Sequence, residues 1–362
     1  MAALRGSMWM LVLYDVAEEI LLDKFPELIG AERLAAQPRF KHPLPEYVRF
    51  ERPPVTEYLE SVRASTGERL QTRIQYFDYG VISVALQLEF DTSWEDLIQL
   101  STRWILAPEI ERLTLALLGS RLEKVRGALQ MPYEHPLSED YYIIHLREAR
   151  DEEGHPMMAQ EMLAAHGSEI AQMVRGDSMP LSEGECKEVL QSSLSYYPSD
   201  LLVVGWVAAL VYDTPDGASP TIQLLEYANA QLLEFRHYDD VLTRVLAKEY
   251  KSLERRGGLF RGWKMAREAE ALNTLRLDIT ELTERTDNAI KFLSDMFYAR
   301  AHRIAAARVG VPDYRHLVDE KLRTAGELYD FMMNEFHQSR AFVLEALVVA
   351  ILVIELFQVF FR

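Results

Sequence analysis

Cysteine is almost absent from this chain of 362 residues, since Cys186 is the single one. One cysteine excludes an intramolecular disulfide and a thiolate metal cage, and it fits a reducing compartment. The surrounding sequence SEGECKEV is rich in acids. Acidic neighbours disfavour the thiolate form, so Cys186 is a poor candidate nucleophile.

Basic residues are outnumbered, with 39 Lys and Arg against 56 Asp and Glu and a formal net charge of −17. Because nucleic-acid binding depends on cationic surface, we expect no direct binding of naked nucleic acid. Apolar residues make up 49% of the chain, enough for a substantial core, and the length predicts two or three modules. The N-terminal apolar run Met8–Tyr14 is too short for a signal peptide, so none is expected.

Catalytic and cofactor motifs are also missing. The chain has no H-E-x-x-H helix and no G-x-S-x-G elbow, and its glycine-rich segment Gly257–Lys264 follows a helix rather than a strand. An E-x-x-H pattern occurs at Glu234–His237, but di-iron bundles need two such helices. The other match, Glu152–His155, falls in a loop broken by glycine. We therefore predict no catalytic, cofactor-binding or metal-binding residues and no cofactor.

A β-hairpin is the clearest local pattern that the chain does contain. The segment VISVALQLEF alternates apolar and polar residues, which predicts a half-buried antiparallel strand; its apolar positions are Ile82, Val84, Leu86, Leu88 and Phe90. An aromatic turn motif precedes it, made of Tyr76, Phe77, Asp78, Tyr79 and Gly80. An acid and a glycine suit a tight turn, and the aromatic rings can pack on neighbouring helices. We interpret the motif as an architectural feature rather than an active site.

The hairpin pattern recurs later in the chain. The segment LVLYDVAEEILL predicts a short strand and then a helix from about Val16 to Leu28, and Ser93 is a plausible N-cap for a helix after the hairpin. A later strand at Asp140–Leu146, a helix and a second hairpin with its turn at Tyr197–Asp200 repeat this order. We predict an α+β fold with a duplicated β-α-β-β-α unit of the ferredoxin-like type.

The last third of the chain predicts long helices. Residues at spacings of three and four predict a coiled-coil seam, with members Leu272, Leu275, Ile279, Leu282, Thr286, Ala289, Leu293 and Met296 on one helix and Val318, Leu322, Ala325, Tyr329, Met332 and Phe336 on the next. A turn is expected at Val309–Pro312. The predicted domains are a first repeat at 1–130, a second at 131–250, a helical hairpin or coiled-coil stalk at 251–340, and a membrane anchor at 341–362.

The C-terminal helix is apolar over Ala341–Phe361 and reaches the roughly 20 residues that cross a bilayer. We predict a single-pass tail anchor that contacts membrane lipid, with the rest of the chain in the cytosol. The alternative is a buried helix in a soluble bundle or oligomer core, which the acids Glu345 and Glu355 make more plausible. An acid inside a membrane faces a partner or is protonated, so Glu355 suggests helix self-association and, less strongly, ion transport.

Two basic clusters are candidate contacts for polyanions. The first contains Arg255, Arg256, Arg261, Lys264 and Arg267, and the second contains Arg300, Arg303, Arg308 and Arg315. The first suits membrane headgroups, and the second suits a cytosolic polyanion such as a ribosome. Solvated helix ends are the plainer alternative for the second cluster.

Three stretches together resemble one known family. They are YFDYGVISV, the pair LLVVGWVAALVYD and LLEYANAQLLEFRHYD, and the tail LYDFMMNEFHQSRAFVLEALVVAILVIELF. In this order they resemble the "required for meiotic nuclear division" family, a domain of unknown function shared with fungal sporulation-related and mitochondrial proteins. The resemblance runs from about residue 70 onward. It implies a membrane-anchored homo-oligomeric scaffold rather than an enzyme, because the animal member supports mitochondrial translation beside the ribosome.

The chain departs from the mitochondrial members because it lacks a basic, acid-poor presequence, so the resemblance implies a bacterial homologue at the cytoplasmic membrane. The leading hypothesis is a non-enzymatic, membrane-anchored oligomeric scaffold that faces the cytosol, with a ribosome or another macromolecule as candidate partner. The alternative is a regulatory protein that senses a small molecule bound between the two α+β repeats.

Overall fold

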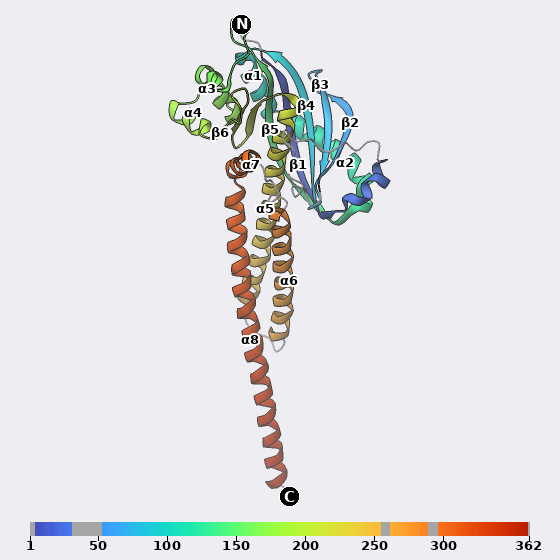
Figure 1. The fold of residues 1–362 in the computed structure, drawn as a ribbon. Coiled ribbons are helices and arrows are strands. Elements are labelled where there is room, and N and C mark those ends of the chain that lie inside the picture. Colours follow the sequence, from blue (N-terminus) through green and yellow to red (C-terminus); the bar gives the residue numbers. More distant parts are fainter. Residues whose placement is uncertain (1–3, 31–52, 255–260, 289–295, 361–362) are drawn as a thin grey trace. The chain divides into compact units, whose positions relative to one another are not determined.

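The computed structural model describes residues 4–30, 53–254, 261–288 and 296–360 and shows a mixed α+β protein (Figure 1). The elements are β1 (Leu4–Ile20), β2 (Val55–Arg63), β3 (Arg69–Tyr76), β4 (Val81–Thr92), α1 (Trp94–Ile105), α2 (Glu109–Val125), β5 (Leu129–Ala149), α3 (Ala159–Arg175), α4 (Glu183–Leu190), β6 (Ser193–Leu194), β7 (Leu201–Val204), β8 (Ala208–Tyr212), α5 (Pro215–Glu254), α6 (Arg261–Asn288), α7 (Met296–Val309) and α8 (Val311–Phe360).

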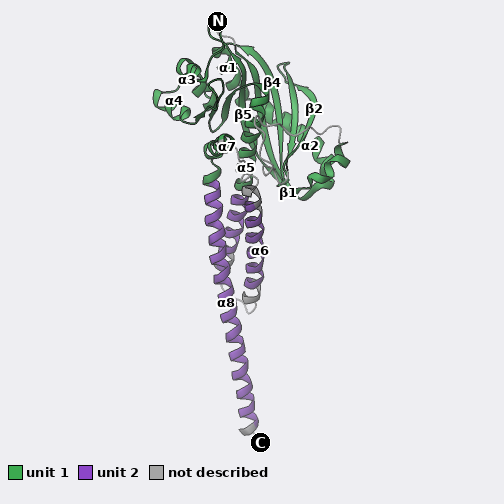
Figure 2. Ribbon diagram, viewed as in Figure 1, with its two compact units in different colours: residues 1–237, 285–313 green, residues 238–284, 314–362 purple. Residues whose placement is uncertain are grey.

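The chain divides into two compact units (Figure 2). The first comprises residues 1–237 and 285–313 and holds the sheet, α1 to α4, the first part of α5, and α7. The second comprises residues 238–284 and 314–362 and is helical. Each unit is therefore built from segments that are distant in the sequence.

One eight-stranded sheet forms the first unit, with the strand order β2-β3-β4-β1-β5-β8-β7-β6. Neighbours are antiparallel except for β5 and β8, which run parallel. The predicted hairpin is confirmed as β3 and β4, with Tyr76 opposite Ile82. Because β1 pairs with both β4 and β5, it lies at the centre of the sheet.

The main core covers one face of this sheet. Alternate residues of β1 and β4 enter it, and the predicted alternation from Ile82 to Phe90 is confirmed. Helices α1 to α4 supply the opposing apolar side chains, including Leu97, Ile110 and Ile170. The predicted N-cap is also confirmed, since the Ser93 hydroxyl accepts a hydrogen bond from the Asp96 amide.

The first part of α5 packs on the opposite face. Arg73 on β3 pairs with Glu226, and Asp15 on β1 pairs with His237, both from α5. Side chains of a strand alternate between faces, and Arg73 neighbours Ile74 of the main core, so these contacts lie on the other side. The prediction that β4 is half-buried is therefore wrong at Ser83, which is fully buried.

The predicted helix from Val16 to Leu28 is also wrong. Strand β1 continues to Ile20, and only a 3₁₀ turn at Leu22–Lys24 and a π-helical turn at Pro26–Gly30 follow. The physical reason is pairing, because Ile20 lies opposite Leu129 of β5 and the ladder fixes an extended backbone. Tertiary context here overrides the helix preference of the local sequence.

The second predicted hairpin has an extra turn. Its first turn, at Tyr197–Asp200, leads from β6 to β7 as expected, but the apolar run that follows breaks into β7 and β8. The Gly205 amide donates to the Ala208 carbonyl and closes this second turn. The halves of the sheet also differ, because β1 pairs antiparallel with β4 while β5 pairs parallel with β8. The ferredoxin-like duplication is not confirmed.

Three helices form the core of the second unit. Leu246 of α5, Met265 and Leu272 of α6, and Ala325 and Met332 of α8 pack together there. The predicted seam positions Leu272, Ala325 and Met332 are thus buried, but α5 packs against them as a third helix. The coiled coil itself is not confirmed. The predicted turn before α8 is present, where Gly310 has a φ of +93°. The predicted stalk at 251–340 includes 255–260 and 289–295, which lie outside the described residues.

Helix α8 ends in an apolar segment whose large side chains, from Phe342 to Phe357, are 48% to 72% exposed. This segment is long and apolar enough to span a membrane. By length and composition, the predicted long apolar C-terminal helix is confirmed.

Two glycines with the same backbone conformation provide a matched test of the hairpin turn. Gly80 and Gly67 have φ values of +99° and +98°. A Cβ atom at position 80 would lie 1.8 Å from the Ala17 carbonyl oxygen, whereas one at position 67 would meet nothing within 4 Å. We expect Gly67→Ala to cost about 1 kcal/mol of unfolding free energy from backbone strain, and Gly80→Ala to cost at least about 2 kcal/mol more from the clash.

Denaturant unfolding of the three proteins in the same detergent, followed by tryptophan fluorescence, measures both costs. Equal destabilisation by the two substitutions would show that β1 does not hold the turn at this distance.

Candidate functional site

The aromatic motif forms the turn between β3 and β4 and is held against β1. Within the turn the Phe77 amide donates to the Val81 carbonyl at 2.9 Å. From β1, the Val16 amide donates to the Gly80 carbonyl at 3.0 Å, and the Ile20 amide donates to the Asp78 carbonyl at 2.8 Å. The turn is therefore held by a hydrogen bond of its own and by two hydrogen bonds from β1.

The aromatic side chains of the motif are buried. The Tyr76 hydroxyl donates to Glu57 Oε2 at 3.1 Å, and the same oxygen lies 3.3 Å from Arg121 Nε. Phe77 and Tyr79 both lie edge-to-face with Tyr227 of α5, at centroid distances of 6.0 Å. The motif thus joins the sheet to α5, which is a packing role, and burial raises the pKa of Tyr79 well above its usual range.

A buried ion pair crosses from the sheet to α5. Arg73 Nη2 donates to Glu226 Oε2, with the two side chains 13% and 0% exposed. The Arg73 guanidinium also lies over the Trp9 ring, 4.9 Å from its centroid. Neither Arg73 nor Glu226 was predicted as a site residue, because the pairing connects positions that are far apart in the chain.

A second polar contact lies further along α5. His237 Nδ1 is 2.7 Å from Asp15 Oδ2, and the Tyr133 ring stacks on the imidazole with centroids 4.4 Å apart. Burial raises the pKa of Asp15 well above its usual range. Burial and the neighbouring Asp15 and Glu234 also raise the pKa of Tyr133. The E-x-x-H pattern at Glu234–His237 thus brings its histidine to an aspartate of β1.

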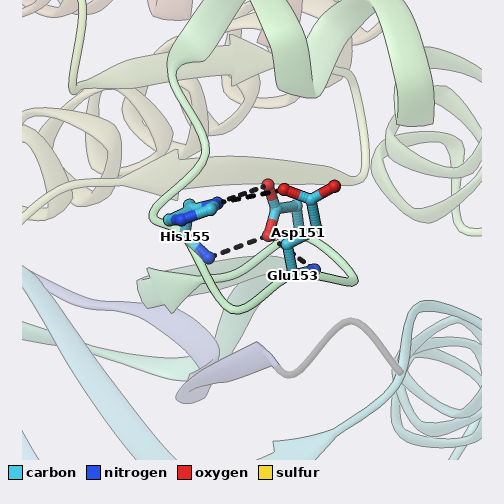
Figure 3. Close-up of side chains that lie close together, drawn as sticks. All are labelled: Asp151, Glu153 and His155. Carbon is cyan, nitrogen blue, oxygen red and sulfur yellow. Dashed lines mark hydrogen bonds and ion pairs between the residues drawn. The ribbon is translucent and has the colours of Figure 1, made fainter.

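The described residues include one group with the spacing of metal ligands, Asp151, Glu153 and His155 (Figure 3). The group lies in the loop that contains the E-x-x-H pattern Glu152–His155. Asp151 Oδ1 accepts hydrogen bonds from the Glu153 and His155 amides, so loop closure already accounts for this carboxylate. These amides also lower the pKa of Asp151. Glu153 and His155 are exposed, and we assign no ion to the group.

The predicted basic residues have different surroundings. Arg255 and Arg256 lie outside the described residues, and Arg261 and Lys264 belong to the first turn of α6. Arg267, Arg300, Arg303 and Arg315 are exposed. Arg308 instead binds Glu188, donating to its carboxylate at 2.5 Å and to its carbonyl at 3.0 Å. Arg308 therefore contributes to packing between α7 and α4.

A cleft lies where β1 and β5 meet the connection between α1 and α2. It measures about 670 Å³, including the part open to solvent, and Glu111, Ser138, Asp140 and Tyr142 are its polar lining residues. The Tyr142 hydroxyl donates to the Ile105 carbonyl at 3.2 Å. The lining of the cleft thus comes from β1, β5 and the segment from the end of α1 to the start of α2.

Comparison with known proteins connects the sheet-bearing part of the chain to a family. A family model described as "Uncharacterized protein MJ0711, N-terminal domain" matches residues 5–219, more than half of the chain. The uncharacterized protein MJ0711 of Methanocaldococcus jannaschii is 18% identical over 187 residues, which cover 52% of this chain and 57% of that protein. The chain thus matches less than two thirds of the relative's length. No solved structure matches.

His302 predicts a pH dependence of stability. This residue of α7 is 5% exposed, lies near Tyr227, and burial lowers its pKa from 6.5 to about 4. Between pH 6.5 and 4 the unfolded chain therefore binds a proton that the folded chain does not, so stability falls as pH falls through this window. The loss amounts to about 3 kcal/mol. We expect His302→Gln to remove it.

Urea unfolding at pH 7 and at pH 4.5 measures the effect as a difference between variant and wild type. The exposed His316→Gln serves as the control. Its free energy of unfolding relative to the wild type should be the same at both pH values. A difference for His302→Gln that stays constant between the two pH values would contradict the prediction.

Proposed function

The chain belongs to the family defined by the N-terminal domain of the uncharacterized protein MJ0711, and on that premise we propose a non-enzymatic, membrane-anchored oligomeric scaffold that faces the cytosol. The observation that carries the proposal is the apolar end of α8. This segment lies outside the matched residues 5–219, so the proposal adds an anchor to the family's domain.

The exposed side chains of α8 make water an unfavourable environment for this segment. Each fully exposed large apolar side chain leaves about 1.5–3 kcal/mol of burial free energy unused. Twelve large apolar side chains between Phe342 and Phe357 are 48% to 72% exposed, and they surround the helix on all sides, so a substantial part of that free energy is unused. A lipid bilayer covers all sides of a helix at once, whereas a single neighbouring helix covers one face.

The length of the segment fits the same conclusion. Residues 341–360 rise about 30 Å along a helix at 1.5 Å per residue, which equals the hydrocarbon thickness of a bilayer. In this proposal the segment crosses the cytoplasmic membrane once, and the sheet-bearing unit lies on the cytosolic side. The scaffold needs no catalytic residue, cofactor or metal.

Self-association follows from the two acids of this segment. Glu345 lies near its start, and Glu355 lies ten residues further, about 15 Å deeper along the axis. A carboxyl group at that depth is costly unless it meets a polar partner, and a second copy of α8 supplies one. The proposed scaffold is therefore a homo-oligomer joined through its membrane helices.

A finer relationship to the "required for meiotic nuclear division" family extends the proposal. It rests on the aromatic hairpin and on the glutamate-bearing tail helix. In this form the scaffold contacts a ribosome or another macromolecule in the cytosol, and the exposed Arg300 and Arg303 of α7 are its candidate contacts. The packed Arg308 is not part of that surface.

A second candidate function is small-molecule sensing, with the halves of the sheet as two related α+β repeats. The cleft where β1 and β5 meet the connection between α1 and α2 favours it, because Asp140 and Glu111 both line it and it has room for a ligand. We rank it second because Tyr142, the aromatic group of the cleft, already binds the Ile105 carbonyl.

Removal of residues 341–362 should convert the protein from a membrane protein to a soluble one. The physical reason is that the exposed apolar surface of α8 leaves with the segment. We expect the full chain to sediment with membranes after a high-pH wash and the truncated chain to remain in the supernatant, as measured by immunoblotting of both fractions.

A chain whose residues 341–361 are replaced by alternating Leu and Ala is the control, and it should sediment like the full chain. If the full chain stays soluble in salt-free buffer without detergent, the anchor is wrong.

Substitution of the deeper acid should weaken the oligomer more than substitution of the outer one. We expect Glu355→Gln to lower the mass of the detergent-extracted protein, because a neutral amide loses the stronger charge-assisted hydrogen bond across the helices. The matched variant Glu345→Gln should keep the mass of the wild type. Light scattering of the extracted proteins measures both, and an unchanged mass for Glu355→Gln would remove this role.

A further inference from the structure

The cleft where β1 and β5 meet the connection between α1 and α2 is large enough for a small molecule. Its cavity volume is about 290 Å³, and the space reaches about 670 Å³ when the part open to solvent is included. Sites for small ligands are concave, and a few polar groups in them fix which ligand binds. The chemistry of the lining therefore indicates the ligand, and this step rests on the second candidate function, small-molecule sensing.

The deepest part of the lining is apolar. Val12 of β1, Ile110 of α2 and Tyr142 of β5 line the cleft and are each at most 4% exposed. Leu106, from the end of α1, adds apolar surface at the rim, where it is 71% exposed. A ligand with a chain of methylene groups can cover this surface and remove it from water.

Two carboxylates supply the charge of the cleft. Glu111, in the first turn of α2, and Asp140 of β5 both line it and are exposed. Neither forms an ion pair among the described residues, and the described lining residues include no lysine, arginine or histidine. Burial, and after it the neighbouring Asp140 carboxylate, raises the pKa of the Tyr142 hydroxyl. A cleft lined by charge of one sign attracts ions of the opposite sign and repels like charge.

The acids beside these two in the sequence have different surroundings. Glu109, also in the first turn of α2, accepts hydrogen bonds from the amide and the hydroxyl of Ser65, both at 2.7 Å. Glu139, the preceding residue on β5, pairs with Arg236 of α5. The protein thus supplies partners for the neighbouring acids, whereas the two acids of the cleft keep carboxylate oxygens available to a ligand.

We propose that this cleft binds a small aliphatic amine, with its ammonium groups at the Glu111 and Asp140 carboxylates and its methylene groups on the apolar floor. An ammonium group has three N–H donors and no acceptor, and an ionised carboxylate has acceptors only, so the two satisfy each other. A neutral ligand leaves both carboxylates without a cation, and an anionic ligand is repelled. The membrane anchor of α8 does not enter this argument.

Titration with 1,5-diaminopentane and with 1,5-pentanediol tests the proposal, because the two have the same chain length and differ by two positive charges. The full-length protein in detergent is titrated with each compound by calorimetry in about 0.15 M salt, where the Debye length of about 8 Å screens the overall negative charge of the chain. We expect saturable binding of the diamine that is at least about tenfold tighter than binding of the diol.

Three variants locate the site. Glu111→Gln and Asp140→Asn each remove one negative charge and should each weaken diamine binding about tenfold, without changing the affinity for the diol. Glu123→Gln is the matched control, because Glu123 is an exposed acid of the same helix, about 18 Å from Glu111 along the axis, and it should leave binding unchanged. An equal loss in all three variants would show attraction by overall charge and would overturn the proposal.

Two further results separate this inference from the function on which it rests. Equal affinity for the diamine and the diol would overturn the amine as ligand and would keep the cleft as a small-molecule site. No saturable binding of either compound would overturn the amine and would count against the sensing function as well. Neither result bears on the membrane anchor, which the sedimentation experiment tests.

Discussion

The buried pair of Arg73 and Glu226 is the interaction on which the arrangement of α5 against the sheet depends. Both side chains are largely shielded from water, so each charge would be strongly destabilising without the other. An apolar contact tolerates a small shift of the helix along the sheet, but a paired guanidinium and carboxylate do not. The pair therefore fixes the position of α5, and Tyr227, the next residue, is placed against Phe77 and Tyr79 as a consequence.

The face of the sheet that packs against α5 carries further buried polar groups, and this is energetically unusual. Ser7, Gln75 and Ser83 have buried side-chain atoms without a hydrogen-bond partner among the described residues. Each such atom costs about 1–3 kcal/mol of desolvation. The main core on the other face is apolar and supplies the bulk of the stabilisation. The polar face against α5 instead fixes the positions of α5 and of the aromatic motif relative to the sheet.

Local patterns predicted the elements whose structure depends on local interactions. The alternation from Ile82 to Phe90, the glycine of the hairpin turn and the long apolar end of α8 were all predictable, because period, turn chemistry and length each have a direct physical cause. The course of β1 beyond Val16 was not, because it depends on β5, more than a hundred residues later. The break at Gly205 was hidden inside an apolar run that reads as one strand.

The candidate sites show the same division. The aromatic motif was recognisable in the sequence, but its partner Tyr227 was not, because a tyrosine in a long amphipathic helix carries no mark of what it will contact. The turn at Tyr197–Asp200 gave a local signal, and there the Asp200 carboxylate accepts a hydrogen bond from the Tyr196 amide.

Helix α8 shows how one continuous helix meets two kinds of surroundings. Around Ala325 and Met332 one face is buried while Arg323 and Asp330 are exposed, which is the pattern of a helix packed in water. From Phe342 to Phe357 large exposed apolar side chains lie on every face, and Glu345 and Glu355 are the two charged residues among them. In the proposed membrane-anchored form, the medium around the helix changes close to Arg340, the last basic residue before the apolar segment. An arginine at that position can direct its guanidinium to lipid headgroups while its methylene groups lie along the apolar helix, which is the usual arrangement where a helix enters a bilayer.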